Sequence, residues 1–210
     1  WGDARAKQIW KKPLAVMVDR YSASASEIFA GAIQDYKRGI IIGQKTFGKG
    51  TVQKLDNLSS GQIKITESKF YRITGAGMQS KGIHPDITLP STWDIEEIGE
   101  SSYDTALPWD EIKPIRFQKF SIGTSLISRL NDEHLMRVSQ SPNLQYILDI
   151  RKRYEIQKNK EAISLNLTNR RLEKEERQLW ALDIENKRLA SLNLVIFVSF
   201  KAMQDYNDAK

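Results

Sequence analysis

Two short stretches of the sequence carry side chains that could together hydrolyse an amide bond. Residues 22–27 read Ser-Ala-Ser-Ala-Ser-Glu, and residues 47–53 read Phe-Gly-Lys-Gly-Thr-Val-Gln. A serine hydroxyl attacks a carbonyl carbon efficiently only when a base removes its proton, and a neutral lysine amine can be that base. A hydroxyl from the first stretch and the amine of Lys49 therefore meet the minimum requirement for a serine hydrolase with a lysine base.

Ser24 lies where an expected strand turns into an expected helix. Residues 14–18 are a short apolar run, which is typical of a buried parallel strand. Residues 27–37 have helical periodicity, with one apolar face made of Ile28, Phe29, Ala32, Ile33 and Tyr36. Ser24 and Glu27 have the spacing of a capping box, which by itself is the simpler interpretation. The alternative is a nucleophile turn, in which N–H groups of the first helical turn also stabilise an oxyanion.

Lys49 follows a second β-branched run, residues 40–42, in a turn flanked by glycines. Residues 43–49 match the start of the phosphate-binding pattern G-x-x-x-x-G-K-[ST], but residue 50 is Gly where a hydroxyl is required. A phosphate-binding loop also continues into a helix, whereas residues 51–55 alternate as in a strand. We therefore expect a strand after Lys49 and disfavour nucleotide binding. An exposed lysine in a flexible turn is the other alternative to a catalytic role.

Longer motifs around both stretches resemble the C-terminal processing peptidases, and in particular their tail-specific branch. The similarity is strongest over residues 18–28, 34–36, 43 and 46–53, continues through 70–72, 79–83, 85–87 and 106–110, and is looser over 163–166. It covers most of the chain and fades after Leu194. The motifs are long, ordered and correctly spaced, so the resemblance is specific.

The resemblance implies a role for each of several residues. Ser24 corresponds to the nucleophile of this family, and Lys49, 25 residues later, corresponds to the general base. Gln53 corresponds to a glutamine that orients the lysine. Asp35 corresponds to an aspartate with an accessory role in the tail-specific branch. Because Asp35 ends the helix that Ser24 opens, about 15 Å away at 1.5 Å per residue, we expect its role to be structural.

Proton abstraction by Lys49 requires a neutral amine. Lysine has a reference pKa of about 10.4, so burial and a lack of neighbouring carboxylates would have to disfavour the ammonium form. Phe47 and the two apolar strands are the expected sources of desolvation. Ser24 would then attack a peptide carbonyl and form an acyl-enzyme that water hydrolyses, while the Ala25 N–H donates to the oxyanion.

Composition argues against several other classes of function. The 210 residues include no cysteine, which excludes thiol catalysis and disulfides. The only histidines, His84 and His134, are too few for a zinc site. A Ser24–His84–Asp86 triad is disfavoured because His84 and Asp86, two residues apart in a turn that contains proline, would have to point toward one another. The net charge is +6, but the basic residues are interleaved with acidic ones along the sequence, which disfavours a nucleic-acid-binding surface. The longest apolar run in the C-terminal part of the sequence, residues 194–200, is too short to span a membrane.

The expected architecture is a partial α/β protease core followed by an α-helical C-terminal domain. Residues 1–92 would form the C-terminal half of the catalytic core, with β structure over 51–90, residues 93–122 a linker, and residues 123–210 the helical domain. By resemblance, the helical domain buttresses the core or docks an adaptor protein. Family members carry a PDZ domain and a strand with an oxyanion glycine before this segment, and neither is in this sequence. We therefore expect the chain to lack part of the oxyanion hole.

Two interpretations of function remain. The first is a serine endopeptidase with a Ser24–Lys49 dyad, which degrades or processes polypeptides that present an apolar, unstructured C-terminus. It would need no metal or other cofactor, and the resemblance places it in the bacterial periplasm, with which the lack of cysteine is compatible. The second is a catalytically incomplete remnant that binds peptides or an adaptor.

Overall fold

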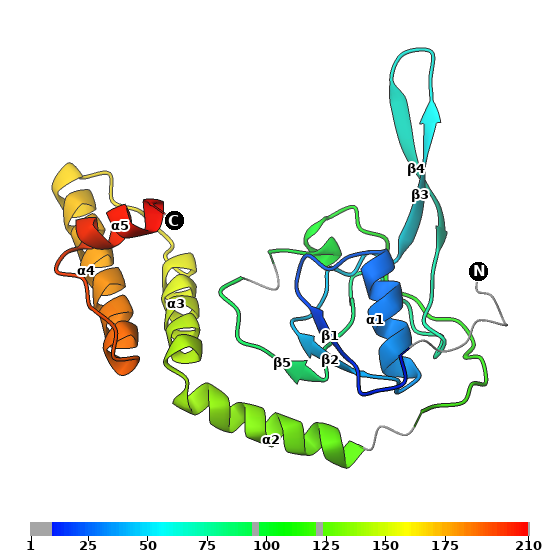
Figure 1. The fold of residues 1–210 in the computed structure, drawn as a ribbon. Coiled ribbons are helices and arrows are strands. Elements are labelled where there is room, and N and C mark those ends of the chain that lie inside the picture. The colour runs from blue at the N-terminus through cyan, green and yellow to red at the C-terminus, as the bar shows by residue number, and fades with distance from the viewer. Residues whose placement is uncertain (1–9, 94–96, 121–123, 210) are drawn as a thin grey trace. The chain divides into compact units, whose positions relative to one another are not determined.

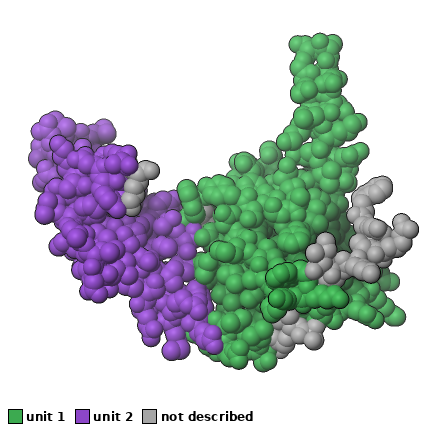
Figure 2. All heavy atoms as spheres, viewed as in Figure 1, with its two compact units in different colours: residues 1–89, 93–132 green, residues 90–92, 133–210 purple. Residues whose placement is uncertain are grey.

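The computed structural model describes residues 10–93, 97–120 and 124–209 of the chain. It divides into two compact units, coloured green and purple in Figure 2. Unit 1 comprises residues 1–89 and 93–132, and unit 2 comprises residues 90–92 and 133–210. Both stretches that could do chemistry belong to unit 1, so its strands and helix position them.

Unit 1 is built around a parallel sheet of three strands in the order β1-β2-β5 (Figure 1). Strand β1 is Ala15–Val18, helix α1 is Ala25–Asp35, and strand β2 is Ile40–Gly43. The short strand β5, Ile87–Thr88, pairs with the end of β2. Because β1 and β2 are parallel, the chain must cross over between them, and α1 is that crossover. The predicted strand, turn and helix around Ser24 are thereby confirmed.

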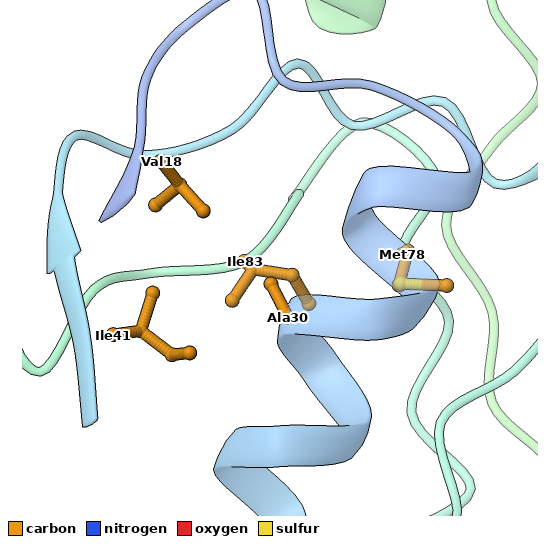
Figure 3. Packing of buried hydrophobic residues seen from close by; sticks show 5 residues of the cluster. All are labelled: Val18, Ala30, Ile41, Met78 and Ile83. Carbon is orange, nitrogen blue, oxygen red and sulfur yellow. The ribbon is translucent and has the colours of Figure 1, made fainter. Parts of the chain in front are cut away.

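The hydrophobic core of unit 1 lies between this sheet and α1. Its buried members are Val18, Ala30, Ile41, Met78 and Ile83, and Figure 3 shows Ile83 next to Ala30 of α1. Helix α1 approaches closely because its inner face is small: a Cβ added at Gly31 would lie 3.1 Å from Ile83 Cδ1. Small residues on the helix therefore pack directly against larger apolar side chains from the rest of unit 1.

The predicted apolar face of α1 is wrong in part. Ile28 and Phe29 are 45% and 54% exposed, and Ala32 is exposed as well. The face that packs inward instead carries Ala30, Gly31 and two carboxylates, Glu27 and Asp35, that are buried with hydrogen-bond partners. Strand β1 also differs from the prediction, because it is an edge strand buried on one face only, with Met17 76% exposed.

Strands β3, Thr51–Asn57, and β4, Gln62–Lys69, form an antiparallel hairpin that extends from unit 1 (Figure 1). The strand expected directly after Lys49 is confirmed. The second strand ends at Lys69. Between there and residue 90 the described chain forms only isolated bridges, such as Tyr71 with Gly77, and the short strand at Ile87–Thr88, so the prediction of β structure over 51–90 is confirmed only in part. Nearly every residue of the hairpin is exposed, except Thr51 at its base.

Residues 97–120, which belong to unit 1, form no long helix or strand. The 3-10 helix η1, Glu100–Ser102, is tied to the lysine loop because the Glu100 N–H donates to the Phe47 carbonyl at 2.9 Å. Further along, the Phe120 N–H donates to the Tyr36 carbonyl at 2.8 Å. This segment is thus held to the loop after β2 and to the C-terminal end of α1.

The predicted helical C-terminal region is confirmed. It contains α2 (Thr124–Gln140), α3 (Pro142–Lys158), α4 (Leu167–Ser191) and α5 (Phe200–Asp208), and α2 crosses the boundary between the units. In unit 2, Ser141 and Asn166 accept N-cap hydrogen bonds that begin α3 and α4. Arg153 of α3 pairs with Glu176 of α4 at 3.1 Å. None of the described helices is long and apolar enough to cross a membrane.

Replacement of Ile41 by Ala should destabilise unit 1. Ile41 is fully buried in the centre of the sheet, so truncation leaves a cavity beneath α1 and should cost about 2–5 kcal/mol. Chemical denaturation measures the change in unfolding free energy. The matched control is Met17→Ala on the neighbouring strand, which is mostly exposed and should change stability by about 0.5 kcal/mol or less. Equal effects from the two variants would contradict the assigned core.

Candidate active site

Ser24 is the N-cap of α1 and has an unusual backbone conformation. Its φ of 56° and ψ of −115° lie in a region that residues with a side chain rarely adopt. Strain of this kind persists only where surrounding contacts impose it, and it is typical of nucleophile turns. The preceding turn is fixed by Asp19, whose Oδ1 accepts from the N–H groups of Tyr21 and Ser22 at 3.0 and 2.9 Å. The N–H of Ala25 belongs to the first turn of α1, where N–H groups lack intrahelical acceptors.

The carboxylate of Glu27 joins the Ser24 turn to the Lys49 loop. Its Oε2 accepts from the backbone N–H groups of Ser24 and Lys49, each at 2.9 Å. Its Oε1 accepts from the Gly48 N–H at 2.7 Å and the Thr46 hydroxyl at 2.5 Å. Ser24 and Lys49 thus share one acceptor atom, and the backbone nitrogen of each lies 2.9 Å from it. The Phe47 N–H adds a second link by donating to the Ser22 carbonyl at 3.0 Å.

A buried cation lies close to this carboxylate. Arg20 is 1% exposed and donates from Nη1 to the Thr46 carbonyl at 2.5 Å. Burial lowers the pKa of Arg20, and the negative charge of Glu27 opposes that shift. Burial also lowers the pKa of the Lys45 amine, with a further contribution from the positive charge of Arg20. Gly99, at φ +136°, allows residues 97–100 to pass over Arg20, since a Cβ there would lie 2.2 Å from Nη2.

A buried glutamine holds the other side of the Lys49 loop. Gln79 is 1% exposed; its Oε1 accepts from the Gly50 N–H, and its Nε2 donates to Glu100 Oε1, both at 2.9 Å. The Lys49 side chain is half-buried between these supports. Among the residues that the structure describes, no carboxylate forms an ion pair with the Lys49 amine. The loop is therefore fixed through its backbone and leaves the amine available.

Lys49 faces an open hollow of about 360 Å³. Five of its lining residues come from the lysine loop and the base of the hairpin: Phe47, Lys49, Thr51, Gln53 and Thr66. The other five come from η1 and the segment after it: Glu100, Tyr103, Thr105, Ala106 and Leu107. Ser24 is not part of this wall. The hollow is thus on the lysine side of the candidate site.

The structure separates the predicted site residues into three groups. Ser24 and Lys49 are brought together at their backbones around Glu27, and Ala25 follows Ser24 as the first residue of α1. Gln53 shares the hollow with Lys49, and its amide lies 3.5 Å from the Thr66 hydroxyl. Asp35 is at the far end of α1, where it forms a buried ion pair with Arg72 through Oδ1 and a 2.9 Å hydrogen bond through Oδ2.

The other chemistries considered from the sequence have no support in the described part of the chain. No hydrogen bond joins His84 to Ser24 or Asp86; the Asp86 carboxylate instead accepts from the Ile41 N–H at 2.7 Å. His134 is a buried residue of α2. No group of three or more metal-ligating side chains is found among the described residues.

Sequence reasoning missed four residues that build the site. Glu27 was identified only as a cap, and Thr46, Gln79 and Glu100 were not identified. A buried carboxylate or amide beside a reactive loop gives no periodic signal. The one available hint was that Thr46 and Gln79 lie inside two of the motifs that carry the family resemblance, residues 46–53 and 79–83.

Comparison with known families assigns both parts of the chain. A model described as peptidase family S41 matches residues 2–89, and one described as the C-terminal domain of tail-specific protease matches residues 93–210. The chain belongs to the tail-specific branch of peptidase family S41. The resemblance identified from the motifs is thereby confirmed.

Individual relatives match this S41 chain over different lengths. It is 39% identical over 198 residues to the tail-specific protease of Haemophilus influenzae, which covers 89% of this chain and 28% of that protein. It is 44% identical over 78 residues to the chloroplastic C-terminal processing peptidase of Tetradesmus obliquus, covering 37% of this chain and 17% of that one. The solved photosystem II D1 C-terminal processing protease is 44% identical over 37% of this chain and 20% of its own, with a TM-score of 0.35. The chain thus spans less than a third of these relatives.

Replacement of Glu27 by Gln should destabilise unit 1 strongly. An amide keeps one acceptor oxygen but turns an NH₂ group toward two of the four donors, so buried N–H or hydroxyl groups lose their partner. The expected loss is about 2–5 kcal/mol of unfolding free energy, measured by urea denaturation. Glu67→Gln on exposed β4 is the matched control and should change stability by about 0.5 kcal/mol or less. An unchanged urea midpoint for Glu27→Gln would show that the shared acceptor does not hold the site.

Proposed function

We propose that this chain supplies the nucleophile and the general base of a serine endopeptidase, with Ser24 as nucleophile and Lys49 as base. The observation that carries the proposal is the shared Oε2 of Glu27, which accepts from both backbone N–H groups at 2.9 Å. This shared acceptor holds the Ser24 turn beside the Lys49 loop, as a nucleophile and its base require. Membership of peptidase family S41 supports the same reaction.

The chemistry follows from these positions. The Lys49 amine takes the proton from the Ser24 hydroxyl as Ser24 Oγ bonds to the carbonyl carbon of the peptide. Lys49 then returns that proton to the departing amine, which leaves an acyl-enzyme on Ser24. Water, deprotonated by the same amine, hydrolyses the ester. The Ala25 N–H at the start of α1 donates to the oxyanion in both steps.

The other predicted residues take supporting roles in this proposal. Gln53 lines the same hollow as Lys49, from which its amide can orient the lysine side chain. Asp35 is engaged by Arg72 at the opposite end of α1, which supports a structural role. The substrates would be polypeptides with an apolar, unstructured C-terminus, in keeping with relatives named tail-specific and C-terminal processing. A periplasmic location and an adaptor bound by the helical region complete the proposal.

Ser24→Ala and Lys49→Ala should each abolish proteolysis. Removal of a nucleophile or its base typically lowers kcat by a factor on the order of 10⁴ or more, with little effect on folding at a surface-accessible site. The assay is degradation of an unfolded protein with an apolar C-terminal tail by the full-length protein that carries this chain. The matched controls are Ser26→Ala, at an exposed residue two positions after Ser24, and Lys54→Ala, at an exposed residue five positions after Lys49.

The controls should degrade the substrate at the wild-type rate. Wild-type rates in both Ser24→Ala and Lys49→Ala would overturn the protease assignment. A wild-type protein that binds the tailed substrate but never cleaves it would instead favour a peptide-binding remnant.

A further inference from the structure

We propose that the hollow beside Lys49 is the subsite for the substrate side chain directly after the scissile bond, and that Glu100 makes it select basic over acidic residues. The proposal rests on the proposed function, because it takes Lys49 as the base. It adds a specificity that neither the family match nor the names of relatives contain.

The position of the hollow decides which side of the scissile bond it serves. Lys49 and Gln53 line it, whereas Ser24 does not. In acyl transfer the acyl part of the substrate becomes bonded to the nucleophile, and the base passes its proton to the departing amine. A hollow on the lysine side therefore faces the departing half of the substrate. The first side chain of that half is the one close enough to enter it.

Among the described residues that line the hollow, Glu100 is the only acidic one. Lys49 also lines the hollow, where its amine carries the proton from Ser24 to the departing amine, so the Glu100 carboxylate is the negative charge that an entering side chain meets. At short range in a partly desolvated site, a carboxylate attracts a cationic side chain and repels an anionic one. The remaining lining residues are uncharged, which leaves Glu100 to set the preference.

The Glu100 carboxylate is held in place rather than free to turn away. The Glu100 N–H donates to the Phe47 carbonyl, and Oε1 accepts from the buried Gln79 amide, both at 2.9 Å. Gln79 in turn is fixed by the Gly50 N–H, one residue after Lys49. A carboxylate can accept about four hydrogen bonds, and Gln79 accounts for one of them. The group thus keeps acceptor capacity for a substrate ammonium or guanidinium.

The wall of the hollow is shared between the two family regions. Lys49 and its neighbours lie in the segment that matches peptidase family S41, and Glu100, Tyr103 and Leu107 lie in the segment that matches the tail-specific C-terminal domain. The volume of about 360 Å³ is at the lower end of the range for small-ligand sites, enough for one long side chain. Specificity at this position would therefore be a property of the tail-specific region.

The test uses the full-length protein and peptides that differ only in the residue after the scissile bond, Lys or Glu. Wild type should cleave the Lys peptide with a kcat/KM about tenfold or more above that of the Glu peptide. Glu100→Gln keeps an oxygen that accepts from Gln79 but removes the charge, so the ratio should fall to about one. Because both peptides are measured on one sample, the ratio does not depend on the fraction of folded enzyme.

The matched control is Asp104→Asn, which removes an exposed carboxylate from the same segment outside the wall of the hollow and should keep the wild-type ratio. An unchanged ratio in Glu100→Gln, or an equal loss in Asp104→Asn, would overturn the subsite. So would a charge preference that appears only for the residue before the scissile bond. Ser24→Ala separates the two proposals: if it abolishes cleavage while Glu100→Gln keeps the ratio, the subsite fails and the protease assignment stands.

Discussion

The buried carboxylate of Glu27 is the constraint on which the candidate site depends. An isolated charge in a protein interior is costly, and here the cost is offset by three backbone N–H groups and one hydroxyl. These donors come from the turn after β1 and the loop after β2, which lie at the same edge of the sheet because the two strands are parallel. Open α/β sheets bring reactive loops together at this edge. The strained backbone of Ser24 is held there by its N–H bond to the same carboxylate.

The segment after residue 93 completes the site rather than only connecting two regions. Trp93 packs edge-on against Tyr21, with ring centroids 5.7 Å apart, and the ring of Tyr103 lies 6.5 Å from that of Phe47. Gly99 passes directly over Arg20. The segment therefore contacts both the turn that carries Ser24 and the loop that carries Lys49. The region matched to the tail-specific C-terminal domain therefore begins with residues that contact the candidate site.

Features with local causes could be predicted from the sequence, and features with distant causes could not. The strand, turn and helix around Ser24, the strand after Lys49 and the helical C-terminal region follow from short-range periodicity and turn residues. The inward face of α1 does not, because Ala30 and Gly31 form the contact while the larger Ile28 and Phe29 are exposed. The role of Glu27 depends on donors 19 to 22 residues away, and a periodic pattern does not encode such pairings.

The parallel crossover also has a consequence for when the candidate site is assembled during synthesis of the chain. The Ser24–Glu27 bond is local, but the bonds that tie Glu27 to the Lys49 loop and that loop to Glu100 all span 19 or more residues, so none of these can form in an isolated helix. Non-local contacts of this kind form late, because loop-closure entropy must be overcome before they contribute stability. Ser24 and Lys49 are therefore not held together until these contacts form. A nascent copy consequently completes most of its local structure before the candidate site is assembled.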